Sequence, residues 1–258
     1  MTDVAERRAL LAQIAGYLAW EQELGGSFVP SVAAPPLRIA PDLEPASASS
    51  QPAPISTAVA TSAPAPSAPA ARLPAPELTR HLALIDAEVK TCTRCELHKG
   101  RTQTVFARGN PETDLVFVGE GPGQEEDRTG LPFVGAAGQL LDKMVAAMGL
   151  ARDAVYICNV VKCRPPGNRT PLPTEAGACA GYLEAQLDLI RPRVIVALGR
   201  CAAENMGLVS GGGWRGRWGR YRGYEVMPTY HPAFLLRSPE FKRPVWEDLQ
   251  RVMAKLKA

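Results

Sequence analysis

The sequence predicts an α/β fold: a three-layer α/β/α sandwich around a mainly parallel central sheet. Short apolar runs typical of buried strands alternate with longer segments of helical periodicity along residues 81–258. This alternation is typical of parallel strands that are joined by crossover helices. The chain has 258 residues, of which 46% are hydrophobic and 21% are charged, so it is large enough to bury a core of this kind.

The first 80 residues differ in composition from the rest of the chain. Leucine, isoleucine and tyrosine recur at helical spacing within residues 5–24, so we expect residues 1–27 to form an amphipathic helix. Twelve of the 24 prolines lie between Pro30 and Pro76, mixed with alanine and serine, which predicts a disordered linker over residues 28–80. The helix is either a loosely tethered appendage or a docking segment for a protein partner.

Eight helices and strands are expected in the domain that follows. The sequence predicts helices over residues 82–92, 135–150, 174–191 and 245–258, and strands over residues 114–120, 154–163, 193–199 and 224–232. Parallel strands place their carboxyl ends along one edge of the sheet, where α/β proteins bind their ligands. We therefore expect this edge to carry four residues that end or follow the strands: Glu120, Asn159, Gly199 and His231.

Bulk composition argues against a membrane protein. No apolar run approaches the roughly 20 residues needed to cross a bilayer, and the first residues lack a signal-peptide pattern. We expect a cytoplasmic protein, whose six cysteines then serve as thiols or metal ligands. Residues 82–258 carry 24 Lys and Arg against 19 Asp and Glu, and this mild excess suits a polyanionic partner.

Four of the cysteines have the spacing of a metal site. Cys92 and Cys95 form a C-x2-C pair, and Cys163 and Cys179 flank a proline-rich segment of fifteen residues. Four thiolates suit either structural zinc or an iron–sulfur cluster, and the spacing alone does not decide between them. The other two cysteines, Cys158 and Cys201, lie in apolar contexts that indicate small buried side chains.

The stretch GEGPGQEED, residues 119–127, begins like a phosphate-binding loop because glycines follow a buried strand. A phosphate site would require a lysine or an open helix N-terminus, and here carboxylates follow instead. Together with GLPFVGAAG, CNVVKCRPPGNR, YHPAFLLR and the cysteine pattern, the stretch resembles the family 4 uracil-DNA glycosylases. These enzymes are the iron–sulfur branch of the uracil-DNA glycosylase superfamily. The similarity covers roughly residues 85–257.

The resemblance implies hydrolytic removal of uracil from DNA, an early step of base-excision repair, and roles for particular residues. Glu120 would stabilise the cationic sugar and orient water, and His231 would stabilise the charge on the departing base. Phe133 would stack on the flipped base, and Asn159 would read its hydrogen-bonding edge. We also expect uracil contacts from Gly121 and Gln124, with Gly121 and Gly123 leaving room for the nucleotide.

The resemblance also implies how the cofactor and the DNA are held. A [4Fe–4S] cluster would bind Cys92, Cys95, Cys163 and Cys179. In AFLLRSP, Leu235 or Leu236 would fill the gap left in the base stack, and Arg237 would meet a phosphate. We take Leu235 and Arg237 as the DNA-binding residues.

Two functions from different classes remain open at this point. The first is a monofunctional uracil-DNA N-glycosylase that acts as a monomer on uracil-containing DNA. The second is a non-catalytic iron–sulfur DNA-binding module of a repair or polymerase complex, tethered through residues 5–24. The arginine- and aromatic-rich stretch over residues 211–225 suggests a hairpin with a basic face, which either binds DNA or keeps an edge strand soluble.

Overall fold

A computed structural model of the protein describes residues 72–209 and 213–258. The predictions for residues 1–71, an N-terminal helix and most of a linker, lie outside the described residues. None of the helices in the described ranges is both long enough and apolar enough to span a bilayer.

The centre of the molecule is a six-stranded sheet in the order β1-β3-β2-β4-β6-β5. Its four inner strands are parallel, and the two short edge strands are antiparallel to their neighbours. The strands are β1 (Arg108–Gly109), β2 (Leu115–Gly119), β3 (Tyr156–Asn159), β4 (Val194–Leu198), β5 (Gly219–Tyr221) and β6 (Tyr224–Thr229). The prediction of a mainly parallel sheet is confirmed.

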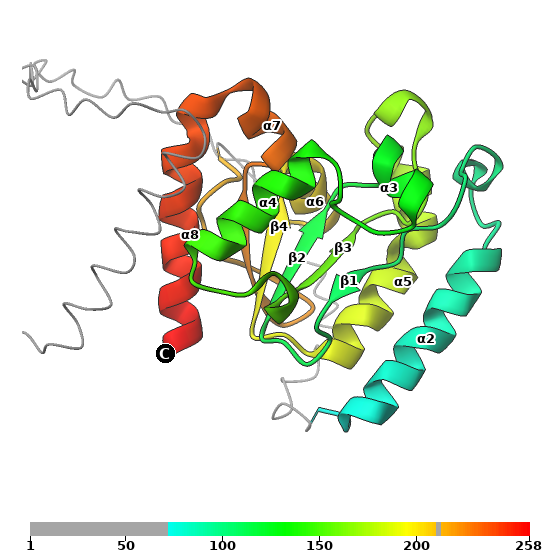
Figure 1. Cartoon of the computed structure of the whole chain (residues 1–258), viewed down its shortest axis with the longest axis horizontal. Coiled ribbons are helices and arrows are strands. Elements are labelled where there is room, and N and C mark those ends of the chain that lie inside the picture. Colours follow the sequence, from blue (N-terminus) through cyan, green and yellow to red (C-terminus); the bar gives the residue numbers. More distant parts are fainter. Residues whose placement is uncertain (1–71, 210–212) are drawn as a thin grey trace, which may run out of the picture.

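Helices cover both faces of the sheet and complete the three-layer sandwich (Figure 1). One face packs against α2 (Ala75–Thr91), α5 (Pro173–Ile190) and α6 (Arg200–Asn205), and the other packs against α4 (Ala136–Ala147), α7 (Pro232–Arg237) and α8 (Lys242–Lys257). Successive residues of β2 alternate between these two cores, with Val116 and Val118 in the first and Leu115 and Phe117 in the second. A further short helix, α3 (Gln124–Thr129), follows the glycine-rich stretch.

The start of the compact domain differs from the prediction. The expected linker over residues 28–80 overlaps α2, which begins at Ala75 and buries Leu78 completely. Pro74 and Pro76 were read as part of the linker, but they occupy the N-cap and first turn of α2. A proline in the first turn removes no helical hydrogen bond, since the N–H groups there have no partner within the helix.

Candidate active site

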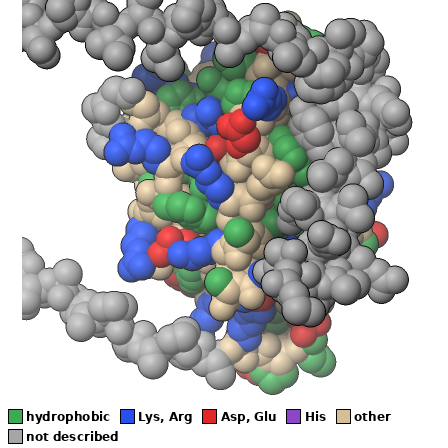
Figure 2. All heavy atoms as spheres, turned by 90° about the vertical axis from the view of Figure 1, so that its left-hand side faces the viewer, with side chains coloured by type: hydrophobic (Ala, Val, Ile, Leu, Met, Phe, Trp, Pro, Cys, Tyr) green, Lys and Arg blue, Asp and Glu red, His purple; other side chains and the backbone are tan. Residues whose placement is uncertain are grey.

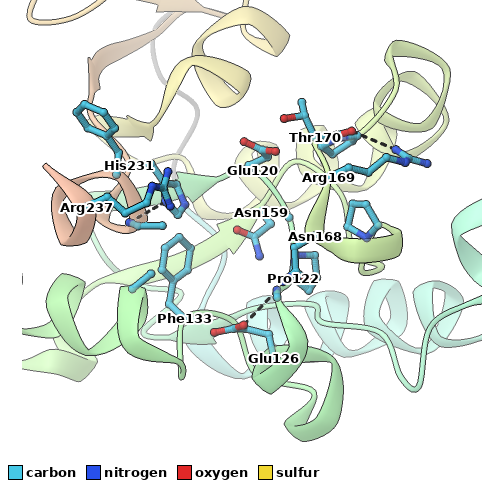
Figure 3. Close-up of a pocket in the computed structure, with 17 residues that line it drawn as sticks. Glu120, Pro122, Glu126, Phe133, Asn159, Asn168, Arg169, Thr170, His231 and Arg237 are labelled. Atoms are coloured by element: carbon cyan, nitrogen blue, oxygen red, sulfur yellow. Dashed lines mark hydrogen bonds between the residues drawn. The ribbon is translucent and has the colours of Figure 1, made fainter.

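The carboxyl ends of the parallel strands converge on one cavity of about 450 Å³ (Figure 3). Glu120 directly follows β2, Asn159 is the last residue of β3, and His231 follows β6 by two residues. Phe133 reaches the same cavity from the loop that precedes α4. The structure therefore brings together these four residues, which the sequence had marked in four separate motifs. The wall is completed by Gly121, Pro122, Gly123, Glu126, Ala137, Pro165, Asn168, Arg169, Thr170, Pro171, Ala233, Phe234 and Arg237.

The Asn159 side chain is a polar group prepared for a ligand. Asn159 is 1% exposed, and its Oδ1 is the one buried side-chain nitrogen or oxygen atom of the described residues that has no hydrogen-bond partner. A buried polar atom without a partner is unfavourable and calls for an explanation. An amide that lines the cavity is explained if a ligand with a complementary donor and acceptor completes its hydrogen bonds.

Phe133 is held in an unusual backbone conformation beside the cavity. Its φ is +55°, in the left-handed region that bulky residues rarely adopt. Its ring is 5% exposed, and the centroid lies 5.6 Å from that of His231. An aromatic face at this position offers a stacking surface for a planar heterocycle.

The loop that carries Phe133 is fixed by Glu126, which lies in the first turn of α3. The Glu126 carboxylate accepts hydrogen bonds from the backbone N–H groups of Gly123 at 3.1 Å and of Val134 and Gly135 at 2.9 Å each. One carboxylate thus joins the glycine-rich loop to the loop that bears the stacking ring. No sequence pattern indicated this bridging role.

A second constraint on Phe133 comes from Arg108 in β1. Its guanidinium donates to the carbonyl oxygens of Pro132 at 2.9 Å and Phe133 at 3.4 Å, and it forms a salt bridge with Asp142. Gly138 lies directly beneath the loop, where an added Cβ would overlap the Phe133 carbonyl. No local sequence signal marks Arg108, because its partners lie about 25 residues away in the chain.

His231 is neutral, and its tautomer is defined by its hydrogen bond. It is the N-cap of α7, and its Nδ1 accepts from the backbone N–H of Ala233 at 3.1 Å. A backbone N–H can only donate, so the proton of the neutral ring resides on Nε2. Burial, together with the nearby Arg237 guanidinium, lowers the pKa of His231 from 6.5 to about 4. The ring therefore has one N–H available to donate to a ligand at neutral pH.

Glu120 is partly buried on the cavity wall beside the loop 164–172. Burial raises the pKa of its carboxyl group, and a hydrogen bond with the Thr170 side chain opposes this rise. The loop is itself anchored by Glu175, which pairs with Arg169 at 2.7 Å and caps α5 by accepting from Leu172 N–H at 2.7 Å. Glu120 therefore faces a wall of defined conformation.

One prediction for the glycine-rich stretch needs correction, and a second gains a packing constraint. Gln124 was expected to contact uracil, but its side chain is exposed at the start of α3 and is not part of the cavity wall. Gly121 and Gly123 do line the cavity, yet an added Cβ at these positions would meet Val161 at 2.8 Å and the Glu126 carboxylate at 2.7 Å, respectively. Close packing within the protein therefore disfavours a side chain at either position, and the room that the glycines leave for the base stays a prediction.

Of the predicted DNA-binding pair, Leu235 is contradicted by its burial, and the role of Arg237 stays a prediction. Leu235 is wrong as an inserted residue, because it is 0% exposed and packs in the core between α7 and the sheet. Its neighbour Leu236 is 46% exposed. The helical turn of α7 puts adjacent residues on different faces, which the sequence AFLLR did not resolve. Arg237 lines the mouth of the cavity and forms no ion pair with any described residue.

The four cysteines line one small cavity beside α2 and α5. Cys92 and Cys95 follow α2, Cys163 follows β3 by four residues, and Cys179 lies in α5; all four line one small cavity. Arg101 donates to the Cys163 Sγ at 3.2 Å and to the Cys92 carbonyl oxygen at 2.8 Å. Within the described ranges, no three Cys, His, Asp or Glu side chains approach closely enough to hold a single metal ion.

Cys158 and Cys201 lie outside this group and are buried, as expected from their apolar contexts. The donor set of the cysteine cavity is thus four thiols with cationic neighbours, which suits a negatively charged, sulfur-ligated group.

The predicted hairpin is present as β5 and β6, but most of its arginines are engaged. Arg215 pairs with Asp248 of α8, Arg220 pairs with Glu225, and Arg222 pairs with two acids of α5. Figure 2 shows basic side chains with acidic ones among them on the face that carries α8. The hairpin arginines thus serve mainly to hold neighbouring elements together.

Comparisons with known proteins place this chain in a family. The sequence model of the Uracil DNA glycosylase superfamily matches residues 106–250. The chain is 46% identical over 188 residues to the type-4 uracil-DNA glycosylase of Thermotoga maritima, which covers 68% of this chain and 95% of that protein. The corresponding protein of Archaeoglobus fulgidus is 44% identical over 177 residues, covering 64% and 88% of the two chains.

A more distant similarity is to the type-5 uracil-DNA glycosylase of Thermus thermophilus, at 38% identity over 111 residues, or 37% of this chain and 50% of that protein. The greater identity and coverage of the type-4 enzymes distinguish the two groups. The chain belongs to the uracil-DNA glycosylase superfamily and, within it, to the type-4 uracil-DNA glycosylases.

Proposed function

We propose that this protein is a DNA repair glycosylase that hydrolyses the bond between uracil and deoxyribose, releasing free uracil and leaving an abasic site. The observation that carries the proposal is the unpartnered Asn159 amide beside the Phe133 ring. Uracil, flipped out of the DNA, would stack on Phe133 and present a carbonyl and a ring N–H to the amide. Cytosine carries an amino group and no ring N–H on that edge, so it would leave the amide mismatched.

The same cavity supplies groups for the two charges that develop in the reaction. As the bond from C1′ to N1 breaks, its electron pair leaves with uracil, and the His231 Nε2–H donates to the uracil oxygen that gains charge. The sugar becomes cationic, and the Glu120 carboxylate stabilises it and orients the water that adds to C1′. No lysine lines the described cavity, so we expect no covalent imine and no strand cleavage.

We further infer that Cys92, Cys95, Cys163 and Cys179 hold a [4Fe–4S] cluster. The support is the convergence of four thiols, the cationic neighbours and the family resemblance. The cluster would act as a structural crosslink and would take no part in glycosidic cleavage. It would join the end of α2 to both ends of residues 163–179, the segment whose loop forms one wall of the base cavity.

DNA contacts outside the cavity are proposed for Arg237 and Leu236. Arg237 has no ion pair among the described residues and could neutralise a phosphate. Leu236 is exposed on the same helix and could enter the stack left by the flipped base. A DNA substrate and six free thiols are consistent with a reducing compartment such as the cytoplasm.

The deciding experiment is a base-release assay with cluster-loaded protein. A labelled oligonucleotide with one uracil should become alkali-labile and yield free uracil, whereas the same sequence with cytosine or thymine should stay intact. Asn159→Ala should reduce release from the uracil strand. Tight binding of uracil-DNA without any base release would instead establish the non-catalytic binding module.

A further inference from the structure

A buried lysine connects the cysteine site to the base cavity. Lys162 lies between Asn159, which lines the base cavity, and Cys163, which lines the cysteine cavity. The residue is 1% exposed, although a lysine side chain ordinarily carries a charged ammonium group. Lysine is almost never fully buried unless its charge is compensated, and the glycosylase chemistry proposed above assigns Lys162 no role.

Lys162 makes two hydrogen bonds, one to a residue of the base cavity and one to a buried residue of α5. Its Nζ donates to the backbone carbonyl oxygen of Asn159 at 2.8 Å and to Gln186 Oε1 at 2.6 Å. Gln186 is fully buried, and its amide group donates to the Tyr156 hydroxyl at 2.9 Å and the Phe106 carbonyl oxygen at 3.3 Å. This network fixes the carboxyl end of β3, from which the Asn159 amide reaches the base.

The hydrogen bonds do not compensate the charge of Lys162. Both acceptors are neutral, and among the described residues no carboxylate lies within ion-pair distance of Nζ. The Phe106 ring, with its centroid 5.9 Å away, offers only weak compensation. A buried cation without a counter-ion is strongly unfavourable. The nearest candidate for a counter-charge is the cysteine cavity, which Lys162 lines together with Cys163 and Cys179.

We propose that Lys162 is a positioning residue whose ammonium is the counter-ion of the thiolate-bound cluster and, through the Asn159 carbonyl, holds the uracil-reading amide in place. The inference rests on the proposed function. It explains why a charged side chain is sealed between two sites, and it links occupancy of the cysteine site to the geometry of base recognition.

The first test removes the charge with Lys162→Met and uses Lys99→Met as the matched control. Lys99 is exposed close to Cys95 and pairs with Glu96. Loss of a positive charge beside a cluster should make its reduction potential more negative, measured by voltammetry of the cluster-loaded protein. Lys162→Met should show this shift and Lys99→Met should not. An unchanged potential in Lys162→Met would overturn the counter-ion role.

The second test is a double-mutant cycle with Asn159→Ala. Lys162→Met alone should lower kcat/KM on uracil-DNA by about 10- to 100-fold, as expected when an outer-shell partner is lost. In the Asn159→Ala background, Lys162→Met should lower kcat/KM by only about twofold or less, because both substitutions disable the same step, recognition of uracil by the Asn159 amide. Full additivity would overturn the link to Asn159.

A third variant keeps the proposal testable if Lys162→Met does not fold. Gln186→Glu places a carboxylate where a neutral acceptor now lies 2.6 Å from Nζ, which gives Lys162 its own counter-ion. The difference in Tm between cluster-loaded and cluster-free protein should narrow, and the reduction potential should fall. An unchanged Tm difference and potential would refute the proposal. These readouts need no activity, so failure of uracil release in the wild type would count against the proposed function alone.

Discussion

The base cavity and the cysteine site lie at opposite ends of one short segment, residues 159–163, but they are built on different principles. The base cavity is shaped by hydrogen bonds within the protein: Glu126 binds three backbone N–H groups, and Arg108 binds two carbonyl oxygens. Among the buried side-chain nitrogen and oxygen atoms of the described residues, Asn159 Oδ1, in this cavity, has no hydrogen-bond partner. The cysteine site instead gathers thiols and cations around a small space.

This difference indicates whether mutations at each site should change activity or stability. A cavity held by its own hydrogen bonds persists without a ligand, so changes to its lining should affect activity and leave the fold intact. If the four thiols beside Lys162 hold a negatively charged group, as proposed, binding of that group is coupled to folding, so changes there should affect stability first. The predictions below test this division, from the largest expected effect to the smallest.

Cys163→Ser should have the largest effect on stability. Loss of one ligand should abolish the visible iron–sulfur absorption and lower the Tm by about 10 °C or more, because several kcal/mol of metal-coupled folding energy is lost. The measurements are absorption spectra, iron content and thermal unfolding. Cys201→Ala is the control, since Cys201 is buried outside the cysteine cavity and should keep both cluster and activity. If Cys163→Ser unfolded at the wild-type Tm, the cysteine site would not control stability, and the expected difference between the two sites would be wrong.

His231→Ala should lower kcat by about 10²- to 10³-fold, the usual cost of removing one preorganised donor to a developing anion. The Tm and the cluster spectrum should stay close to the wild type. His81→Ala is the control, because His81 lies on α2, away from the cavity. Single-turnover uracil release measures the effect. A wild-type rate for His231→Ala would refute the role of its Nε2 proton.

Glu126→Gln should have an intermediate effect through the position of Phe133. A hydrogen bond to a charged group contributes about 1.5–3 kcal/mol, so loss of the carboxylate should reduce kcat/KM by about 10- to 100-fold. Glu125→Gln is the matched control, since Glu125 is exposed and pairs only with Arg128 and not with the loop. Equal activity of the two variants would show that the cavity does not depend on the hydrogen bonds of the Glu126 carboxylate.

The smallest expected effect is that of pH, acting through His231, on kcat/KM and on folding stability. The pKa of His231 is lowered to about 4 from 6.5, so the ring stays neutral between pH 8 and about pH 5 and should not limit kcat/KM there. Because the unfolded chain binds the proton more readily, His231 disfavours folding increasingly as the pH falls from about 6.5 towards 4. An NMR titration of His231 checks this; a midpoint near 6.5 would contradict it.

Sequence patterns were sufficient for the elements whose signals are local. Apolar runs fixed the four inner strands, and the residues that follow them, Glu120, Asn159 and His231, had to share one edge because parallel strands end together. The start of α2 was placed late, since Pro74 and Pro76 look like linker residues until Leu78 is seen to be buried.

No local sequence pattern indicated the hydrogen bonds around Phe133 or that Leu235 is buried while Leu236 is exposed. Arg108 meets the Phe133 carbonyl across 25 residues, and Lys162 meets Gln186 across 24. Such pairs depend on how the helices pack against the sheet, and the periodicity of apolar residues along the sequence does not encode that packing. By itself, the sequence determined the fold class, the strand ends and the cysteine set, because these follow from patterns between near neighbours. Only the tertiary structure decided which leucine faces solvent, which acid clamps the stacking ring and which buried cation joins the two sites, because these depend on contacts through space.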